Sequence, residues 1–265
     1  PIDTISSIQS KRNTSVYYLV GVSGLFAMKY ENKKWISLGK LQNLDKKIIT
    51  IAETADGLVW LGTNYSGLYR INFSKGFDRN ADIQQIREGE SGLPEQFRWV
   101  DVYSTNNGIL FSTSKGIYRY DEENYIFYSD TLLGIDFSNH DSWVFPIIED
   151  NYNNLWYSSG KKDEFAKQTT LALFNGKNKK YTLETQPFIR YSDVTVEAIY
   201  YKDSIVWFGG DDGLIRFNYK EFSKNENNFT CLISEVHNND NTLNSYSSNY
   251  KISVGIEQLP NDSLI

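Results

Sequence analysis

Short runs of apolar and aromatic residues recur along most of the chain, each interrupted by small residues and a polar turn. Five segments share one order: an apolar run, a pair drawn from Gly, Ser and Thr, a turn, and a second apolar pair often followed by Arg and an aromatic residue. They lie at 17–30, 58–72, 109–121, 154–176 and 205–218. No segment sustains the 3.6-residue period of an amphipathic helix. The pattern therefore predicts an all-β fold.

A glycine after the turn gives the length of the repeat. It recurs at Gly24, Gly67, Gly116 and Gly213, at steps of 43, 49 and 97 residues, the last step spanning two repeats. A period in this range is typical of the four-stranded blade of a β-propeller. A glycine at this position can take the positive φ that a tight hairpin needs. The chain is thus predicted to supply about five propeller blades.

Each unit is predicted to contain four strands, which in the second unit lie at 48–53, 58–62, 67–72 and 83–87. Asn, Asp and Gly between the first and second strands favour tight hairpins. The small pairs, such as Gly62-Thr63 and Ser112-Thr113, are expected where strands converge on the propeller axis. Trp60, Trp156 and Trp207 share one register and are predicted to fill the space between neighbouring blades.

Composition agrees with this prediction and excludes several classes of protein. The 19 Tyr, 15 Phe and 6 Trp favour half-buried pleated surfaces. A net charge of −6 argues against nucleic-acid binding. No run of apolar residues is long enough to span a membrane. The single Cys231 permits no internal disulfide. Neither a metal nor a cofactor is expected. The sequence does not start with Met, which predicts that Pro1 begins a processed or excised segment.

Two stretches carry a family resemblance. DGLVWLGTNYSGLYRIN (56–72) resembles the repeat of the two-component regulator propellers, and SGLPEQFRWVDVYSTNNGILFSTSKGIYRYD (91–121) adds that family's Gly-Leu-Pro segment. These propellers form the periplasmic sensor region of Bacteroides-type hybrid two-component systems, which contain a histidine kinase. The resemblance covers roughly residues 1–222, which it implies are propeller blades. Family propellers usually have seven blades, so closure would require upstream sequence unless this chain is unusual or partial.

The tail extends the resemblance beyond the repeats. FTCLISEVHNNDNTL (229–243) resembles the strand that opens the immunoglobulin-like domain following the propeller in this family. Residues 223–265 are therefore predicted to be a linker and the start of that domain. The resemblance implies a periplasmic location, with membrane contact only through regions downstream. It leaves open whether the output is a histidine kinase or a membrane-bound transcription regulator.

The predicted binding site lies in the loops of one propeller face. Loops from each outer strand to the next inner strand, and from second to third strands, emerge there. They carry aromatic and charged side chains that the repeat itself does not require, and these are the predicted ligand-binding residues: Tyr65, Arg98, Trp99, His140, Trp143, Arg190 and Tyr191. Arg98-Trp99 and Arg190-Tyr191 pair a flat ring with a polar group, as saccharide sites do. Blade packing for each aromatic, and a solvated surface charge for each Arg, are the alternatives.

The chain offers little for catalysis, so no catalytic residue is predicted and the segment is expected not to be an enzyme. His140 and His237 lie far apart in the sequence, and the acid pairs are adjacent, without the separation that a glycosidase needs. No phosphate loop or nucleophile elbow occurs. The leading hypothesis is a sensor that recognises an oligosaccharide or another small ligand. A propeller lyase or hydrolase using His140 is the alternative, and a dimerising propeller without a small ligand, forming a homodimer, is a third.

One loop stands out by its length. The fourth repeat carries an insertion at 161–170 between its second and third strands. Surplus loops on a rigid scaffold often carry recognition. The alternative is a charged loop without a binding role.

Overall fold

The computed structural model describes residues 4–134, 137, 141–161, 167–192, 194–211, 213–222, 235–238 and 241–245. The chain divides into two compact units, Pro1–Tyr219 and Lys220–Ile265. The first unit contains five antiparallel sheets and the second a pair of strands. The predicted all-β class and the propeller blades are confirmed.

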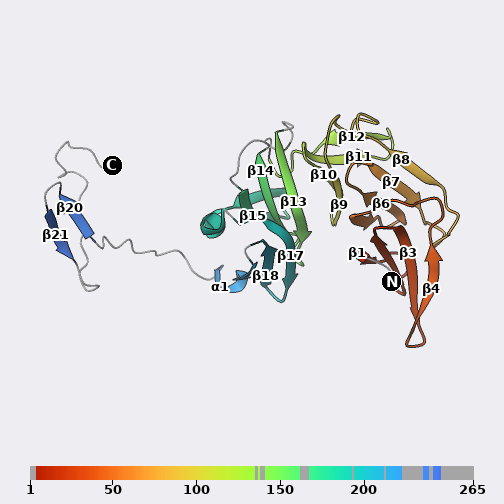
Figure 1. Cartoon of the computed structure of the whole chain (residues 1–265), viewed down its shortest axis with the longest axis horizontal. Helices are drawn as coiled ribbons and strands as arrows, with labels where there is room; N and C mark the ends of the chain where they lie inside the picture. The colour runs from red at the N-terminus through yellow and green to blue at the C-terminus, as the bar shows by residue number, and fades with distance from the viewer. Residues whose placement is uncertain are drawn as a thin grey trace. The chain divides into compact units, whose positions relative to one another are not determined.

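The blades follow one another along the chain, as the colours of Figure 1 show. Four of them have four strands and the fifth has three among the described residues. The strands of the first three blades are β1 (Thr4–Gln9), β2 (Val16–Gly21), β3 (Gly24–Glu31), β4 (Lys34–Lys40), β5 (Thr50–Glu53), β6 (Leu58–Gly62), β7 (Leu68–Asn72), β8 (Ile83–Ile86), β9 (Val100–Thr105), β10 (Gly108–Thr113), β11 (Gly116–Asp121) and β12 (Ile126–Ser129). Those of the last two are β13 (Ser142–Glu149), β14 (Leu155–Lys161), β15 (Lys167–Asn175), β16 (Lys180–Glu184), β17 (Val196–Lys202), β18 (Ile205–Gly210) and β19 (Gly213–Asn218).

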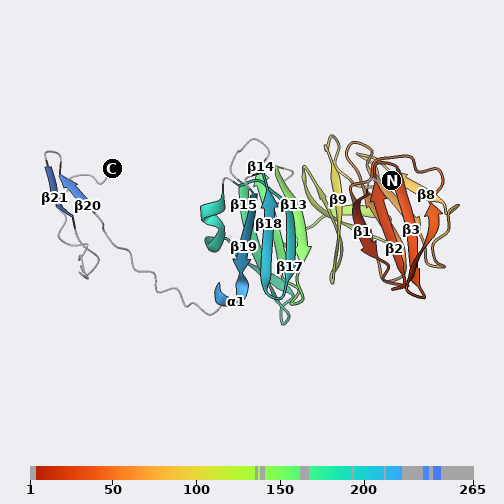
Figure 2. The same cartoon turned by 60° about the horizontal axis from the view of Figure 1, so that its bottom comes forward.

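Each predicted repeat segment forms the second and third strands of one blade. The strands predicted for the second unit agree with β5 to β8 to within two residues at every end. Sequential strands pair as antiparallel meanders, and the first strand of each blade contacts the first strand of the next. β1, β5, β9, β13 and β17 are therefore the inner strands. Figures 1 and 2 show the first and fifth blades at opposite ends of the unit.

The cores lie between blades, because the alternation of a strand sends successive side chains to opposite faces. β6 is buried along its whole length. Val59 and Leu61 pack with the first blade, whereas Trp60 packs with the third. A strand covered on both faces is expected to be continuously apolar, as LVWLG is. This alternation is what joins consecutive blades into one unit.

Two of the three repeated tryptophans occupy the predicted place between blades. Trp60 lies with its ring 4.9 Å from that of Phe111 in the third blade. Trp156 is fully buried against rings of the fifth blade, including Phe208 and Phe217. Trp207 differs, because it is only half-buried. Its face of the fifth blade meets no further blade among the described residues, so packing of Trp207 between blades stays a prediction.

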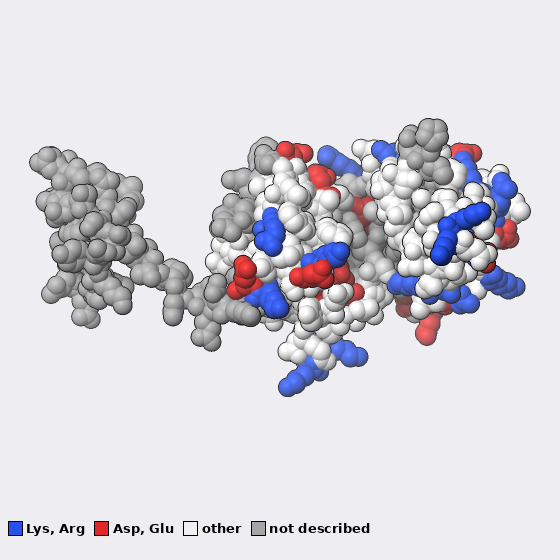
Figure 3. Space-filling view, turned by 90° about the horizontal axis from the view of Figure 1, so that it is seen from below, with Lys and Arg blue, Asp and Glu red and all other residues white. Residues whose placement is uncertain are grey.

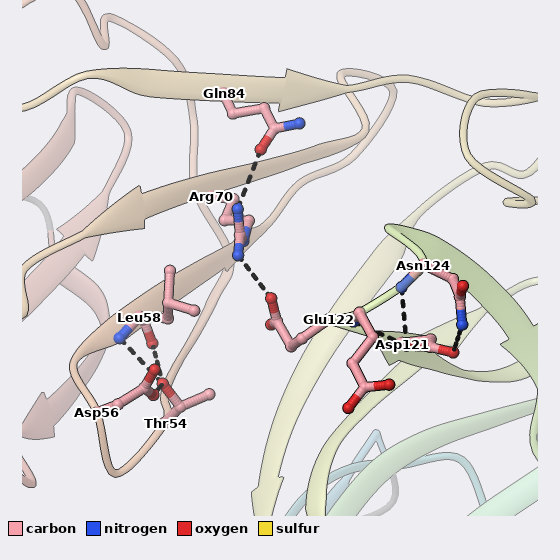
Figure 4. Close-up of polar contacts among 9 residues, drawn as sticks. Thr54, Asp56, Leu58, Arg70, Gln84, Asp121, Glu122 and Asn124 are labelled. Carbon is pink, nitrogen blue, oxygen red and sulfur yellow. Dashed lines mark hydrogen bonds and ion pairs between the residues drawn. The ribbon is translucent and has the colours of Figure 1, made fainter.

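A polar contact also joins the second and third blades. Figure 4 shows Arg70 of β7 between Gln84 on its own blade and Glu122 on the third. Arg70 Nη2 donates to Glu122 Oε2 at 2.6 Å. The guanidinium carbon also lies 5.6 Å from the centre of the Trp60 ring. Arg70 thus covers the edge of the core between the second and third blades and pairs across it.

The turn glycine has the predicted backbone conformation in all four repeats that carry it. At Gly116 the φ angle is 107°, and a Cβ there would lie 2.1 Å from the backbone oxygen of Phe137. A side chain at this position would therefore be opposed both by its own backbone and by the neighbouring loop.

Three local features differ from the sequence-based expectation. In the insertion at 161–170, the described residues 161 and 167–170 are strand, because the pairing of β14 with β15 extends to Gly160 and Lys167; residues 162–166 lie outside the described part. The connection between β16 and β17 contains the 3₁₀ helix η2 (Gln186–Tyr191), with Pro187 in its first turn. A short helix, α1 (Tyr219–Phe222), follows β19. Short helices of this kind give no sustained periodicity in a sequence.

The second unit contains β20 (Glu235–Asn238) and β21 (Asn241–Ser245), which pair as an antiparallel hairpin. The predicted domain boundary lies between residues 222 and 223, three residues after the division of the chain at Tyr219. The immunoglobulin-like domain stays a prediction.

Candidate functional site

A pocket of about 480 Å³ opens where loops of three blades meet. It lies at the starts of the inner strands β9, β13 and β17, and it includes the β10–β11 turn and the start of β15. Its lining residues are Gln96, Arg98, Trp99, Ser114, Lys115, Trp143, Phe145, Lys167, Thr195, Val196 and Glu197. Both predicted classes of loop thus contribute to one site, which we call the three-blade pocket.

The segment carrying Arg98 and Trp99 is held by hydrogen bonds to turns on both sides. The Arg98 amide donates to Ser114 Oγ at 3.1 Å, and the Tyr65 amide donates to the Arg98 carbonyl at 3.3 Å. Trp99 forms a bridge with Asn64 of the second blade. These three contacts hold the backbone of residues 98 and 99, and so they fix the place from which both pocket side chains project.

Trp143 owes its position to a glycine on the neighbouring strand. It pairs with Gly160 across β13 and β14. A Cβ on Gly160 would lie 2.5 Å from Cζ2 of the indole, so only glycine lets the ring lie against the strand. Trp99 and Phe145 add a second aromatic contact, with ring centres 5.9 Å apart and planes at 59°. The pocket wall therefore presents rings from two adjacent blades.

Three cationic side chains, Arg98, Lys115 and Lys167, line the pocket together with one carboxylate, Glu197. The Lys167 ammonium donates to Thr195 Oγ1. None of these four charged groups forms an ion pair with another residue in the described part of the chain. The described lining therefore carries an excess of positive charge.

A second pocket of about 400 Å³ adjoins the first, and Lys167 lines both. Its walls are formed mainly by polar residues of β14 and β15 and by η2, with Phe137 and Phe188 as its only aromatic rings among the described residues. It contains neither of the predicted tryptophans. The three-blade pocket combines aromatic faces with charge and is the stronger candidate.

Of the seven predicted ligand-binding residues, the structure brings Arg98, Trp99 and Trp143 together in the pocket. Tyr65 lies beside it, 83% exposed, and is joined to Arg98 through the backbone. His140 lies outside the described residues. Arg190 and Tyr191 belong to η2, but their side chains are not described. Ligand binding by these seven residues stays a prediction.

Sequence reasoning missed Lys115, Phe145, Lys167 and Glu197. Lys115 and Lys167 fall in loops that were identified, but charged loop residues are common and nothing local distinguishes these two. Phe145 lies inside β13, where an aromatic residue is expected for packing alone. Only the convergence of three blades reveals that these side chains share one pocket.

A buried acid was also missed. Asp101 lies on the inner strand β9 and is only 2% exposed. Burial raises its pKa to about 7, and Thr50 and Tyr103 beside it partly oppose this effect. The Tyr103 hydroxyl is near enough to influence the pKa but is not aligned to satisfy the Oδ1 atom of Asp101. An aspartate between two valines in WVDVYS was the available signal.

No group of three or more His, Cys, Asp or Glu residues within the described ranges is arranged to hold a metal ion. In the same ranges, no helix has both the length and the apolar character needed to cross a membrane.

Comparisons with known proteins give structural similarity alone. No protein-family model matches the chain, and no curated protein matches it. Two solved structures of the extracellular domain of BT4673 from B. thetaiotaomicron, described once as a hybrid two component system and once as a one component system, share 15% and 16% identity with TM-scores of 0.46 and 0.48. They cover 79% and 82% of this chain and 26% and 27% of theirs.

The tricorn protease is similar over 80% of this chain and 29% of its own, with 9% identity and a TM-score of 0.40. This chain thus spans little more than a quarter of the length of these solved chains. The similarities assign no ligand and no activity to it.

Proposed function

We propose that this chain is an extracytoplasmic ligand-sensing segment of a two-component sensor and that it recognises an oligosaccharide in the three-blade pocket. The observation that carries the proposal is the convergence on one pocket of Arg98 and Trp99, which precede β9, and Trp143, which lies at the start of β13. The repeats that resemble two-component regulator propellers supply the signalling context. A periplasmic location and a downstream histidine kinase belong to the same proposal.

The chemistry of the pocket suits a sugar. Aromatic rings present flat apolar faces, against which the C–H face of a pyranose can pack. Arg98, Lys115 and Lys167 supply donors, and Glu197 supplies an acceptor, for hydroxyl groups at the ring edge. A volume of about 480 Å³ lies within the usual range of small-ligand pockets.

Signalling would follow from the division of the pocket among blades. A ligand that contacts β9, β13 and β17 at once binds best to one arrangement of the three inner strands. It therefore shifts the protein towards that arrangement, and only by its difference in affinity between arrangements. The fifth blade is the last before the C-terminal unit in the sequence. A change in the arrangement of its strands would therefore be passed to that unit.

Calorimetric titration of the chain against a panel of oligosaccharides, chosen by glycan array, tests the proposal. Trp99→Ala and Trp143→Ala should each weaken binding roughly tenfold or more, because each removes a ring from the centre of the site. Trp35→Ala is the matched control, since Trp35 is an exposed tryptophan on β4 of the first blade. Binding that both pocket variants retain unchanged, or a panel without any saccharide ligand, would refute the proposal.

A lyase or hydrolase is not advanced as a second candidate. That hypothesis depends on His140, which lies outside the described residues, and no other observation favours it.

A further inference from the structure

The charge of the three-blade pocket is opposite in sign to that of the chain. The sequence carries 27 Lys and Arg against 33 Asp and Glu, for a net charge of −6. Among the described residues, the pocket lining has three cations and one carboxylate. On the face seen in Figure 3, by contrast, side chains of both signs are interspersed. A local excess of positive charge on an acidic protein indicates a site that attracts anions.

The three cations come from separate elements and border one cavity. Arg98 precedes β9, Lys115 lies in the β10–β11 turn, and Lys167 begins β15. None of them has a carboxylate partner among the described residues. Elsewhere in the described chain, Lys29, Arg70 and Arg119 are each paired with an acid. Most other Lys and Arg of the described chain also lack an ion pair, so the distinguishing feature of the pocket is the grouping of three cations around one cavity.

The aromatic wall narrows the chemistry of the anion. A small inorganic anion would use the cations but not the rings of Trp99, Trp143 and Phe145. A neutral sugar would use the rings but leave the positive charge uncompensated. A saccharide with acidic substituents uses both, because its ring packs on the aromatic faces while its carboxylates or sulfates accept charge-assisted hydrogen bonds.

We infer that the three-blade pocket selects acidic oligosaccharides, whose carboxylate or sulfate groups pair with Arg98, Lys115 and Lys167. The inference rests on the proposed function and specifies the ligand class for the same pocket. Arg98 can receive a carboxylate or a sulfate with two parallel N–H donors, whereas each lysine acts as a point charge. Glu197 accepts from hydroxyl groups and disfavours a second anion on its own side.

The test uses pairs of saccharides that differ only in charge. The chain is titrated with tetragalacturonic acid and with its carboxyl-reduced, neutral form, and with a heparin-derived tetrasaccharide and its desulfated form. We expect at least one acidic probe to bind roughly tenfold or more tightly than its neutral counterpart, with an affinity that falls as NaCl is raised. Which of the two pairs shows the difference distinguishes carboxylate from sulfate recognition.

Substitutions then assign the effect to the pocket. Arg98→Gln should weaken the acidic probe roughly tenfold, as expected for loss of a charge-assisted hydrogen bond, and should weaken the neutral probe much less, because the Gln amide can still donate to a hydroxyl group. Lys115→Gln should act in the same direction with a smaller effect. Lys34→Gln, at an exposed lysine of the first blade, should change neither.

The outcomes separate this inference from the function on which it rests. A neutral saccharide that binds as tightly as its acidic counterpart, and is weakened by Trp99→Ala but not by Arg98→Gln, would overturn the acidic-ligand inference and support the sensor proposal. Absence of binding by acidic and neutral saccharides alike would overturn both.

Discussion

Asp101→Asn tests whether the buried acid on β9 costs stability when it ionises. Asp101 is 2% exposed, and its Oδ1 atom has no hydrogen-bond partner. Burial is the largest cause of its raised pKa of about 7, with Thr50 and Tyr103 lowering the value in part. No described cation lies in an ion pair with it, so the folded protein favours the neutral acid.

The size of the effect follows from the shift of the pKa. The change from 3.8 to about 7 is roughly 3 units, or about 4 kcal/mol at most. Because the folded pKa is raised, the folded state binds the proton more tightly than the unfolded state. The corresponding stability is fully present below pH 3.8 and is lost as the pH rises through about 7. Between about pH 4.5 and pH 8, this group alone should reduce the free energy of unfolding by about 3 kcal/mol.

Urea unfolding followed by tryptophan fluorescence, at about pH 4.5, 6 and 8, measures this effect. An asparagine amide cannot ionise, so Asp101→Asn should lack the loss of about 3 kcal/mol. The amide can also change the free energy of unfolding by an amount that does not depend on pH. This amount cancels when the values for one variant at different pH are compared. Asp211→Asn, at an exposed aspartate, is the control and should follow the wild-type curve. Parallel curves for wild type and Asp101→Asn over this range would refute the reasoning.

Two further predictions concern the packing between blades. Trp156→Ala should lower the free energy of unfolding by about 3–5 kcal/mol, as expected when a fully buried large ring is removed. In the same urea titration, Trp207→Ala should lower it by less than half as much, because Trp207 lies on the uncovered face. A double-mutant cycle of Arg70→Gln and Glu122→Gln should give a coupling of about 0.5–1 kcal/mol, because the two side chains are 19% and 46% exposed and solvent screens the pair; a coupling of zero would contradict a stabilising role for this contact.

The fold was predictable because each blade repeats the same local requirements. A glycine after the turn, a small pair and an alternating apolar run are short-range signals, and five copies in register reinforce one another. The burial of Trp207, by contrast, cannot be predicted from its own repeat. Its register matches that of Trp156, yet burial of a blade face depends on the neighbour that covers it. Local sequence determines the orientation of the ring but not whether a neighbour is present.

The candidate site was predictable only in part. Arg98, Trp99 and Trp143 stood out because the repeat does not require them in loops of the predicted face. Lys115 and Lys167 resemble the solvated lysines found all over such a surface. Their significance arises from contacts between residues about 50 positions apart in sequence, on consecutive blades, which a period of that length brings together. An aromatic residue stands out within the sequence of a single loop. That several lysines and an arginine line the same pocket can be recognised only in the folded protein.

The position of the pocket among the blades bears on how a sensor of this kind would work. Val196 and Glu197, which line the pocket, belong to β17 of the fifth blade. That blade is packed on one face through Phe208, whereas on the other Tyr200 and Leu214 are 60% and 67% exposed. An element with fewer buried apolar contacts opens at a lower free-energy cost than the blades covered on both faces. A ligand that also contacts β9 and β13 would therefore stabilise the fifth blade more than any other. Under the proposed function, the blade expected to respond most to the ligand is thus the one that precedes the C-terminal unit in the sequence.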